Sequence, residues 1–271
     1  MTGATDNHAF GAFNLMYSAL LSNPFASLLY IDLGLSTRML SYLKAHFETF
    51  YQLQTKLKSN GFLAYRRFNW DSFPKWMNLL KADRSKRGGY GWKPIVLYDA
   101  FHQWQGLFSW IDAGSVIIDS LSREFSLARR YGFYSPYSAG VIKQWTHPDM
   151  ISFMKEHEFI KNVNSDFPNC SGGLVYIDYS STYTHELMRK WMLCAYTSKC
   201  IVPKTAVHKN HRFDQAALSL LISHYNIPMS CNGLTDFHPS LRNEASDTTQ
   251  ILANIVIPLQ QTSHKIIEFE I

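Results

Sequence analysis

The sequence predicts an α/β protein with a mainly parallel central sheet flanked by helices on both faces. Short apolar runs, typical of buried strands, alternate with longer segments whose apolar residues recur at helical spacing. Parallel strands need such crossover helices, so the alternation favours a parallel sheet. No internal repeat or long linker divides the 271 residues, and one α/β domain often contains this many. We therefore expect a single domain over 1–271.

Each expected element follows from a local pattern. The helix over 8–22 ends at Asn23-Pro24, because proline disfavours helix in the residue before it. A second helix, over 38–58, is amphipathic and ends near Asn60-Gly61. A third begins near Pro94, since proline suits a first helical turn. The remaining expected elements are strands at 27–31, 62–66, 107–111, 173–177 and 251–257 and helices at 181–197 and 213–225.

Composition and charge narrow the function. Hydrophobic residues make up 46% of the chain and charged residues 17%, as in ordinary globular proteins. The net charge is +5, and Lys and Arg are scattered apart from a run at 81–87, interpreted as a solvated loop. Nucleic-acid binders concentrate charge on one face, so we expect no nucleic-acid partner. No run reaches about 18 apolar residues and no signal peptide is visible, so we expect no membrane span, with cytoplasm and a lumenal compartment both open.

The four cysteines, Cys170, Cys194, Cys200 and Cys231, are too few for a disulfide scaffold. Cys194 and Cys200 are close enough in sequence to pair in an oxidising compartment. A zinc site formed by this pair with His208 and His211 is the alternative. Zinc sites usually begin with cysteines two to four residues apart, which disfavours zinc here.

Two polar loops near the start of the chain are candidate ligand sites. Thr2-Gly-Ala-Thr-Asp6-Asn7-His8 follows a possible first strand and opens a helix, where backbone N–H groups can face a nucleotide. The alternative is that Thr5 or Asp6 only caps the helix. Asp32-Leu-Gly34 resembles the Asp-x-Gly element of methyltransferases that bind S-adenosylmethionine, but no glycine-rich continuation follows, which favours a plain turn.

Two further loops combine glycines with one charged residue. Gly88-Gly-Tyr-Gly-Trp-Lys93 allows close approach of backbone to a ligand, and Lys93 can neutralise a phosphate. The alternative is a flexible turn before a helix. Asp112-Ala-Gly114 ends a buried strand, where an unpaired carboxylate is costly. Asp112 is therefore expected to contact a ribose or a divalent cation, with a structural turn as an equal alternative.

The last two motifs lie in the second half of the chain. Asn169-Cys-Ser-Gly-Gly173 is a small-residue turn that can pass close to a sugar. Asn210-His-Arg-Phe-Asp-Gln215 opens a helix, where Asp214 and Gln215 can bind sugar hydroxyls or Asp214 can act as an acid or base. Alternatively, Asp214 favours the helix dipole and Arg212 pairs with a carboxylate.

In their order along the chain, these motifs resemble those of the GT-A glycosyltransferases, particularly the glycogenin-like and galactinol-synthase-like retaining families. Those families carry a T-x-D-x-x-Y loop after the first strand, then a DxD motif, an N-x-G turn and a D-Q helix start. The matching segments are Thr5-Asp6-Asn7, Asp112-Ala-Gly114, Asn169-Cys-Ser-Gly172 and Asp214-Gln215.

A closer resemblance, from Thr2 to about residue 225, is to a family of nucleotide-diphospho-sugar transferases. It is carried by Asp32-Leu-Gly-Leu-Ser36, Tyr90-Gly-Trp-Lys-Pro94, Trp110-Ile-Asp-Ala-Gly114, Trp145-Thr-His-Pro148, Cys200-Ile-Val-Pro-Lys204 and Asn210-His-Arg-Phe-Asp-Gln215.

The resemblance implies a GT-A fold in which 1–115 binds the nucleotide and 116–271 binds the donor sugar and the acceptor. It implies an enzyme that transfers a hexose or related sugar from a UDP- or GDP-linked donor to a hydroxyl of a glycan, protein or lipid-linked acceptor. The implied donor contacts are Thr2, Gly3, Ala4, Asp6, Asn7, Lys93, Asp112, Gly114, Gly172 and Gly173, and the implied catalytic residues are His211, Asp214 and Gln215.

The expected metal site departs from the family pattern. Gly114 stands where the second aspartate of DxD usually holds the cation, and His238 is a substitute for a closing histidine motif that is not recognisable. Asp112 and His238 are therefore the candidate ligands for Mn²⁺ or Mg²⁺. Two other functions remain open: a methyltransferase built around Asp32, and a non-catalytic carbohydrate-binding relative with the same fold.

Overall fold

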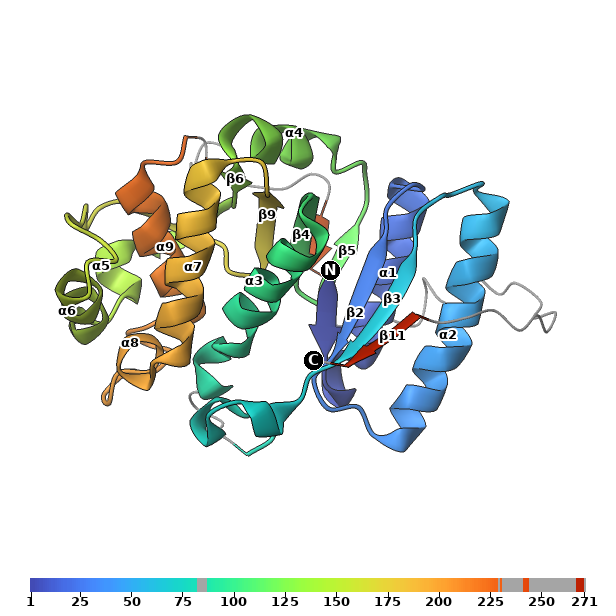
Figure 1. Cartoon of the computed structure of the whole chain (residues 1–271), viewed down its shortest axis with the longest axis horizontal. Coiled ribbons are helices and arrows are strands. Elements are labelled where there is room, and N and C mark those ends of the chain that lie inside the picture. The colour runs from blue at the N-terminus through green and yellow to red at the C-terminus, as the bar shows by residue number, and fades with distance from the viewer. Residues whose placement is uncertain (82–86, 229, 231–240, 244–266, 271) are drawn as a thin grey trace. The chain divides into compact units, whose positions relative to one another are not determined.

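A computed structural model describes residues 1–81, 87–228, 230, 241–243 and 267–270 (Figure 1). The chain forms two compact units. Unit 1 comprises Met1–Asn69, Ile111–Leu121 and the described residues of Phe237–Ile271, and unit 2 comprises Trp70–Trp110 and the described residues of Ser122–Asp236. The expected division of roles at residue 115 concerns ligand binding and stays a prediction.

Unit 1 is built on a four-stranded parallel sheet in the order β1-β2-β3-β11. β2 is buried along its whole length, as expected for a central strand of a parallel sheet. Asp32 is in register with Ala4 of β1 and Arg67 of β3, so three strands end at one edge of the sheet. The strands are β1 (Thr2–Ala4), β2 (Leu28–Asp32), β3 (Leu63–Arg67) and β11 (Ile267–Glu270).

Two helices complete the core of unit 1. Helix α1 (Ala9–Ser22) follows the 3₁₀ turn η1 (Asp6–His8) and is buried over most of its length. Helix α2 (Thr37–Lys56) buries one face, and Ser36 caps it by accepting a hydrogen bond from the Met39 amide. The helices pack through rings such as Tyr17 and Phe50, whose centroids are 4.3 Å apart. A short antiparallel pair, β5 (Ser115–Ile117) with β10 (Leu241–Asn243), completes the described part of this unit.

Unit 2 contains a three-stranded sheet in the order β4-β9-β6 and a separate pair, β7-β8. Helix α3 packs against α7, and α7 against α9 (Figure 1). The strands are β4 (Leu107–Ile111), β6 (Phe133–Tyr134), β7 (Tyr137–Val141), β8 (Pro168–Cys170) and β9 (Leu174–Asp178). The helices are α3 (Trp92–Trp104), α4 (Ser122–Tyr131), α5 (Ile142–Trp145), α6 (Pro148–Glu156), α7 (Thr182–Tyr196), α8 (Ser198–Ile201) and α9 (Asp214–Tyr225), with 3₁₀ turns η2 (Trp70–Ser72), η3 (Lys75–Met77) and η4 (Arg87–Tyr90).

A disulfide joins the end of α7 to α8. Cys194 and Cys200 are bonded, with their Cα atoms 5.3 Å apart, which confirms the pairing expected from their spacing. Neither sulfur is therefore available to a metal, and the zinc alternative is wrong. Cys170 is disulfide-bonded as well.

The structure confirms most of the elements expected from periodicity and corrects two motifs. The confirmed elements are α1, β2, α2, β3, α3, β4, β9, α7 and α9, whereas the strand expected over 251–257 lies outside the described residues. Thr2–Ala4 forms the first strand instead of the loop that follows it. Asn169 lies in strand β8, so the small-residue turn begins only at Ser171.

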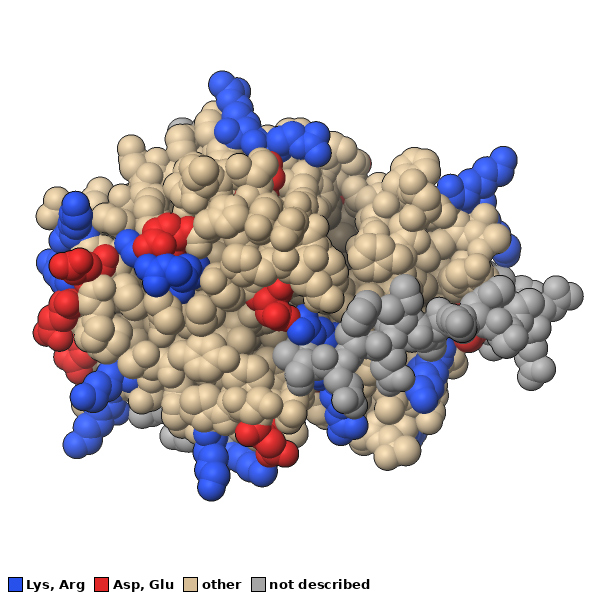
Figure 2. Space-filling view, in the orientation of Figure 1, with Lys and Arg blue, Asp and Glu red and all other residues tan. Residues whose placement is uncertain are grey.

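Among the described residues, no helix is both long and apolar enough to cross a bilayer. On the face that Figure 2 shows, Lys and Arg side chains lie in several separate places with Asp and Glu between them. The charge on this face is dispersed, as the scattered sequence positions predict.

Candidate functional site

Unit 2 brings three of its predicted site segments together around one buried ion pair. The Nζ atom of Lys93, at the start of α3, donates a hydrogen bond of 3.1 Å to the carbonyl of Gly172. The same Nζ lies 3.6 Å from Oδ2 of Asp214, the first residue of α9, and both side chains are only 6% exposed. Burying two charges is costly unless they are paired and hydrogen-bonded. The ion pair therefore holds this carboxylate in one position, at a desolvation cost to the free energy of folding.

The start of α3 is fixed by the glycine-rich turn before it. Gly88 and Gly89 have φ angles of +59° and +61°, which residues with a Cβ rarely adopt. A Cβ on Gly88 would lie 2.2 Å from the carbonyl oxygen of Met77, and one on Gly89 would lie 2.5 Å from the side chain of Val202. These glycines pack against protein, which favours the structural alternative. They allow the tight turn that places the Lys93 side chain in the interior of unit 2.

Aromatic rings enclose the ammonium group of Lys93. Its Nζ atom lies 5.7 Å from the ring centroid of Trp110, 5.8 Å from that of Tyr90 and 6.0 Å from that of Trp92. Cation–π attraction of this kind strengthens when the cation is removed from water. Lys93 is expected from the sequence to contact the donor's diphosphate or the donor sugar. In this structure, its ammonium is engaged by Gly172, Asp214 and these rings.

The first turn of α9 is held from two sides. Nε1 of Trp191 donates a hydrogen bond of 3.0 Å to the carbonyl of Asp214. Phe213 precedes the helix with a φ angle of +50°, an unfavourable conformation for an aromatic residue, and is buried. Such strain persists only where the surroundings impose it, and it often marks functional sites. Gln215 is half-buried beside Asp214.

Gly172 lies so close to α9 that only a glycine fits. A Cβ added there would lie 2.9 Å from the Cβ of Gln215 and 3.3 Å from Oδ2 of Asp214. We therefore expect Gly172→Ala to displace the start of α9 and to lower the free energy of unfolding by about 1–3 kcal/mol, as overpacking typically does. Gly114→Ala is the matched control, because a Cβ there meets nothing within 4 Å. Equal denaturation midpoints for the two variants would contradict this packing.

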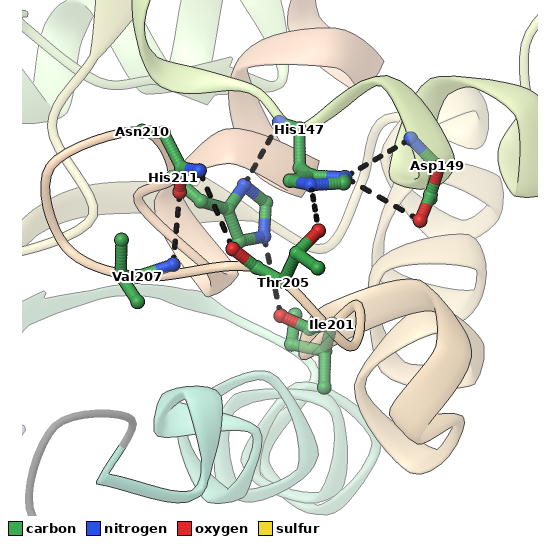
Figure 3. A network of polar contacts seen from close by, with 7 residues as sticks. All are labelled: His147, Asp149, Ile201, Thr205, Val207, Asn210 and His211. Atoms are coloured by element: carbon green, nitrogen blue, oxygen red, sulfur yellow. Dashed lines mark hydrogen bonds and ion pairs between the residues drawn. The ribbon is translucent and has the colours of Figure 1, made fainter.

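The third expected catalytic residue, His211, is buried in a backbone network (Figure 3). Its Nδ1 accepts a 3.2 Å hydrogen bond from the His147 amide, and its Nε2 lies 3.2 Å from the carbonyl of Ile201, to which it donates. His147 in turn binds Thr205 through Nε2 at 2.8 Å and caps α6 by accepting from the Asp149 amide. Both ring nitrogens of His211 are therefore occupied, which favours a structural role over proton transfer.

The network makes stability depend on pH. Burial lowers the pKa of His211 from 6.5 to about 4, because the charged ring cannot be solvated there. At pH values between about 4 and 6.5, His211 is protonated in the unfolded chain but not in the folded chain. This stabilisation is complete above pH 6.5, and about 3 kcal/mol of it is lost as the pH falls to about 4. Urea unfolding at several pH values should show this slope in wild type and a flatter one in His211→Gln; an unchanged slope would contradict it.

In unit 1, only part of the expected nucleotide loop is accessible. Thr2, Gly3 and Ala4 are buried in β1, whereas Asp6 and Asn7 are exposed just beyond its carboxyl end. Asp6 accepts a hydrogen bond of 2.7 Å from the amide of Ser36. Ligands of open parallel sheets bind beyond the carboxyl ends of the strands. Asp6 and Asn7 are therefore more accessible to a nucleotide than Thr2, Gly3 and Ala4.

Asp32 is occupied by the turn that it closes. Its Oδ1 accepts from the amides of Gly34 and Leu35 at 2.8 and 2.6 Å, and its Oδ2 accepts from the hydroxyl of Tyr65 at 2.6 Å. The side chain is buried. A carboxylate with these three donors is a structural turn residue, which removes the main support for a methyltransferase site.

The Asp112–Gly114 loop lies in unit 1. Asp112 and Gly114 are exposed, so the expected burial of this carboxylate is wrong. The Asp112 carbonyl accepts from the Ser115 amide at 3.1 Å and closes a turn. His238 lies outside the described residues, and among those described no three His, Cys, Asp or Glu side chains gather as a metal-binding group. Binding of Mn²⁺ or Mg²⁺ stays a prediction.

Two side chains that the sequence did not single out support these sites. Trp191 anchors Asp214, and Tyr65 binds Asp32. Each lies in an element with a regular apolar pattern, so the sequence predicts only a core residue at each position. Only the topology shows that their polar atoms face the start of α9 and the end of β2.

Comparison with known proteins identifies the fold. No protein-family model and no curated protein matches the chain. Mouse xyloside xylosyltransferase 1 in its apo form matches with a TM-score of 0.50 and 10% identity, over 91% of this chain and 97% of that one. The bifunctional glycosyltransferase WbbM, also apo, gives 0.47 and 12%, over 82% of this chain and 37% of that one, so the chain spans little more than a third of WbbM. The galactosyltransferase LgtC, in complex with donor and acceptor sugar analogues, gives 0.46 and 12%, over 81% and 69%.

At these identities the likeness shows the fold alone, and the match to the xylosyltransferase carries it. The chain has the α/β fold of the GT-A glycosyltransferases, as the sequence motifs predicted.

Proposed function

We propose that this chain is a glycosyltransferase that passes a sugar from a nucleotide-diphosphate donor, UDP- or GDP-linked, to an acceptor hydroxyl. The observation that carries the proposal is the Asp214 carboxylate, held by Lys93 and packed against Gly172. Three segments remote in sequence converge on it, and a fold used by glycosyltransferases surrounds it. Because fold does not fix function, the proposal depends on this site.

The nucleotide is assigned to unit 1. Asp6 and Asn7 are exposed at the carboxyl end of β1, where backbone and carboxylate groups can bind a base or ribose. Gly114 leaves open space beside Asp112, so that a ligand can approach the backbone closely. Thr2, Gly3 and Ala4 are assigned the supporting role of strand residues.

The sugar is assigned to unit 2. The Asp214 carboxylate accepts hydrogen bonds only, and the Gln215 amide both donates and accepts, so together they can orient hydroxyl groups of opposite polarity. Lys93 fixes the carboxylate, Gly172 packs directly against it, and Gly172 and Gly173 are the residues assigned to border the donor sugar. A fixed carboxylate can accept the acceptor's proton or stabilise positive charge that develops on the donor sugar.

A divalent cation has a separate proposed role. A divalent cation, when bound near Asp112, would neutralise the charge of the leaving diphosphate. With Gly114 in place of a second carboxylate, Asp112 is the one described side chain expected to contact it. Titration of UDP with and without Mn²⁺, in wild type and Asp112→Ala, measures this contribution directly.

Calorimetric titration with UDP, GDP and their sugar conjugates tests the proposed donor. We expect one nucleotide to bind, and Asp6→Ala to weaken it about tenfold or more, as for loss of a hydrogen bond to a charged group. Asp119→Ala is the matched control, because Asp119 is also an exposed carboxylate of unit 1 that accepts from a backbone amide. Absence of binding by every nucleotide, with or without Mn²⁺, would contradict the proposed function.

A further inference from the structure

A long stretch of unit 2 carries positive charge without any acidic residue. From Leu187 to Phe213 the sequence contains no Asp or Glu but six Lys or Arg. Two of the six, Arg189 and Lys190, pair with Glu186 just before the stretch, and the other four lie between 199 and 212. The stretch ends at the residue before Asp214, so it leads directly to the proposed site. Such an imbalance next to a site suits a negatively charged ligand.

Arg212, within this stretch, lies against an aromatic ring. Its guanidinium carbon lies 4.1 Å from the ring centroid of Trp145, and its amide donates to the Trp145 carbonyl at 3.0 Å. Arg212 and Trp145 are both half-buried. A guanidinium that lies over an indole ring can still direct N–H groups to a carboxylate, sulfate or phosphate and form a fork with it.

A second arginine and a histidine lie near this stack. Nη1 of Arg87 donates to the hydroxyl of Tyr90 at 3.2 Å, and the Tyr90 ring lies 6.3 Å from that of His208. The His208 ring packs 4.9 Å from Phe213, the residue after Arg212. Arg87, His208 and Arg212 are called the basic cluster below.

The described residues provide no carboxylate to neutralise the basic cluster. Within residues 1–81 and 87–228, Arg212 forms no ion pair, so the carboxylate partner considered from the sequence is not found there. Partial burial, together with the charges of Arg87 and Arg212, lowers the pKa of His208. The electrostatic potential at the basic cluster is therefore positive, so binding of an anion lowers its electrostatic free energy.

We propose that the basic cluster binds the negatively charged group of an acidic glycan, which is the acceptor of the transfer. The inference rests on the proposed function and names its acceptor class. The cluster lies wholly in unit 2, beside the Asp214 helix start, whereas the residues assigned to the nucleotide lie in unit 1. The shared ligand chemistry is a carboxylate, sulfate or phosphate carried on a sugar.

Calorimetry with matched oligosaccharides, in the presence of UDP, tests the inference on the full chain. Each pair differs in one charged group: glucuronate against glucose at the terminus, or a sulfated or phosphorylated sugar against the plain one. We expect wild type to bind one charged member about 10- to 100-fold more tightly than its neutral partner, the range of a charge-assisted contact. Arg212→Ala should lose most of this preference, and His208→Ala should lose part of it, because the lowered pKa leaves His208 mainly a hydrogen-bonding group at neutral pH. Lys199→Ala should keep it, because Lys199 is an exposed cation of the same stretch outside the cluster.

Three results would overturn the inference: equal binding of charged and neutral partners by wild type, a preference that survives undiminished in Arg212→Ala and His208→Ala, or a preference lost equally in Lys199→Ala. A fourth, weaker UDP binding by Arg212→Ala with no change in glycan preference, would assign the cluster to the donor's diphosphate and also overturn it. Failure of wild type to bind any nucleotide contradicts the proposed function instead, so the two failures are distinct.

Discussion

Lys93→Met is expected to lower the free energy of unfolding by about 3–5 kcal/mol, the usual result of removing one partner of a buried ion pair. Methionine fills a similar volume, so the loss is mainly electrostatic. The substitution leaves the buried Asp214 carboxylate without its ammonium and the Gly172 carbonyl without the hydrogen bond that Lys93 donates. Urea denaturation followed by circular dichroism measures the change.

Lys143→Met is the matched control, because Lys143 pairs with Asp166 at the surface, where both side chains are mostly exposed. Exposed pairs contribute less than about 1 kcal/mol. The double variant Lys93→Met with Asp214→Leu should regain much of the lost stability, since it removes both charges. A Lys93→Met variant as stable as Lys143→Met would show that the ion pair does not organise this site.

Asp214→Asn is expected to reduce turnover of the donor about 10²- to 10⁴-fold, the range for loss of a catalytic carboxylate. Asparagine preserves the shape and the hydrogen-bonding oxygen, so the loss reports the missing charge. Nucleotide affinity should change little, because the residues assigned to the nucleotide lie in unit 1. Release of nucleoside diphosphate gives kcat, and calorimetry gives the affinity for the nucleotide.

The control for this experiment is Asp166→Asn, which removes an exposed carboxylate of unit 2. Its kcat should equal that of wild type. A fall in nucleotide affinity as large as the fall in kcat for Asp214→Asn would contradict the assignment, because it would place Asp214 at the nucleotide instead of the sugar.

The sequence predicts the regular parts of the fold because their patterns are local. Helix α2 keeps one apolar face along its 20 residues, and β2 is a continuous apolar run. The local pattern of apolar residues therefore identifies both elements. The short elements between 115 and 170 carry too few residues for a pattern: β6 is two residues long and α5 is four. Their positions depend on tertiary contacts.

The sequence motifs singled out Lys93, Gly172 and Asp214 separately, and the contact among them appears only in the structure. Their roles toward a ligand stay predictions. The sequence motifs did not show that Lys93 is buried, because burial depends on how α3 packs in unit 2. His211 reads equally well as an acid–base residue or as a core residue, and only its two backbone partners favour the second reading.

The proposed function requires that a nucleotide-sugar donor is turned over at Asp214. Its most direct test is release of nucleoside diphosphate from a panel of UDP- and GDP-sugars by wild type and Asp214→Asn, each with and without Mn²⁺. We expect release from at least one donor by wild type and a loss of about 10²-fold or more in the variant. Release from no donor by wild type, or equal release by both proteins, would contradict it.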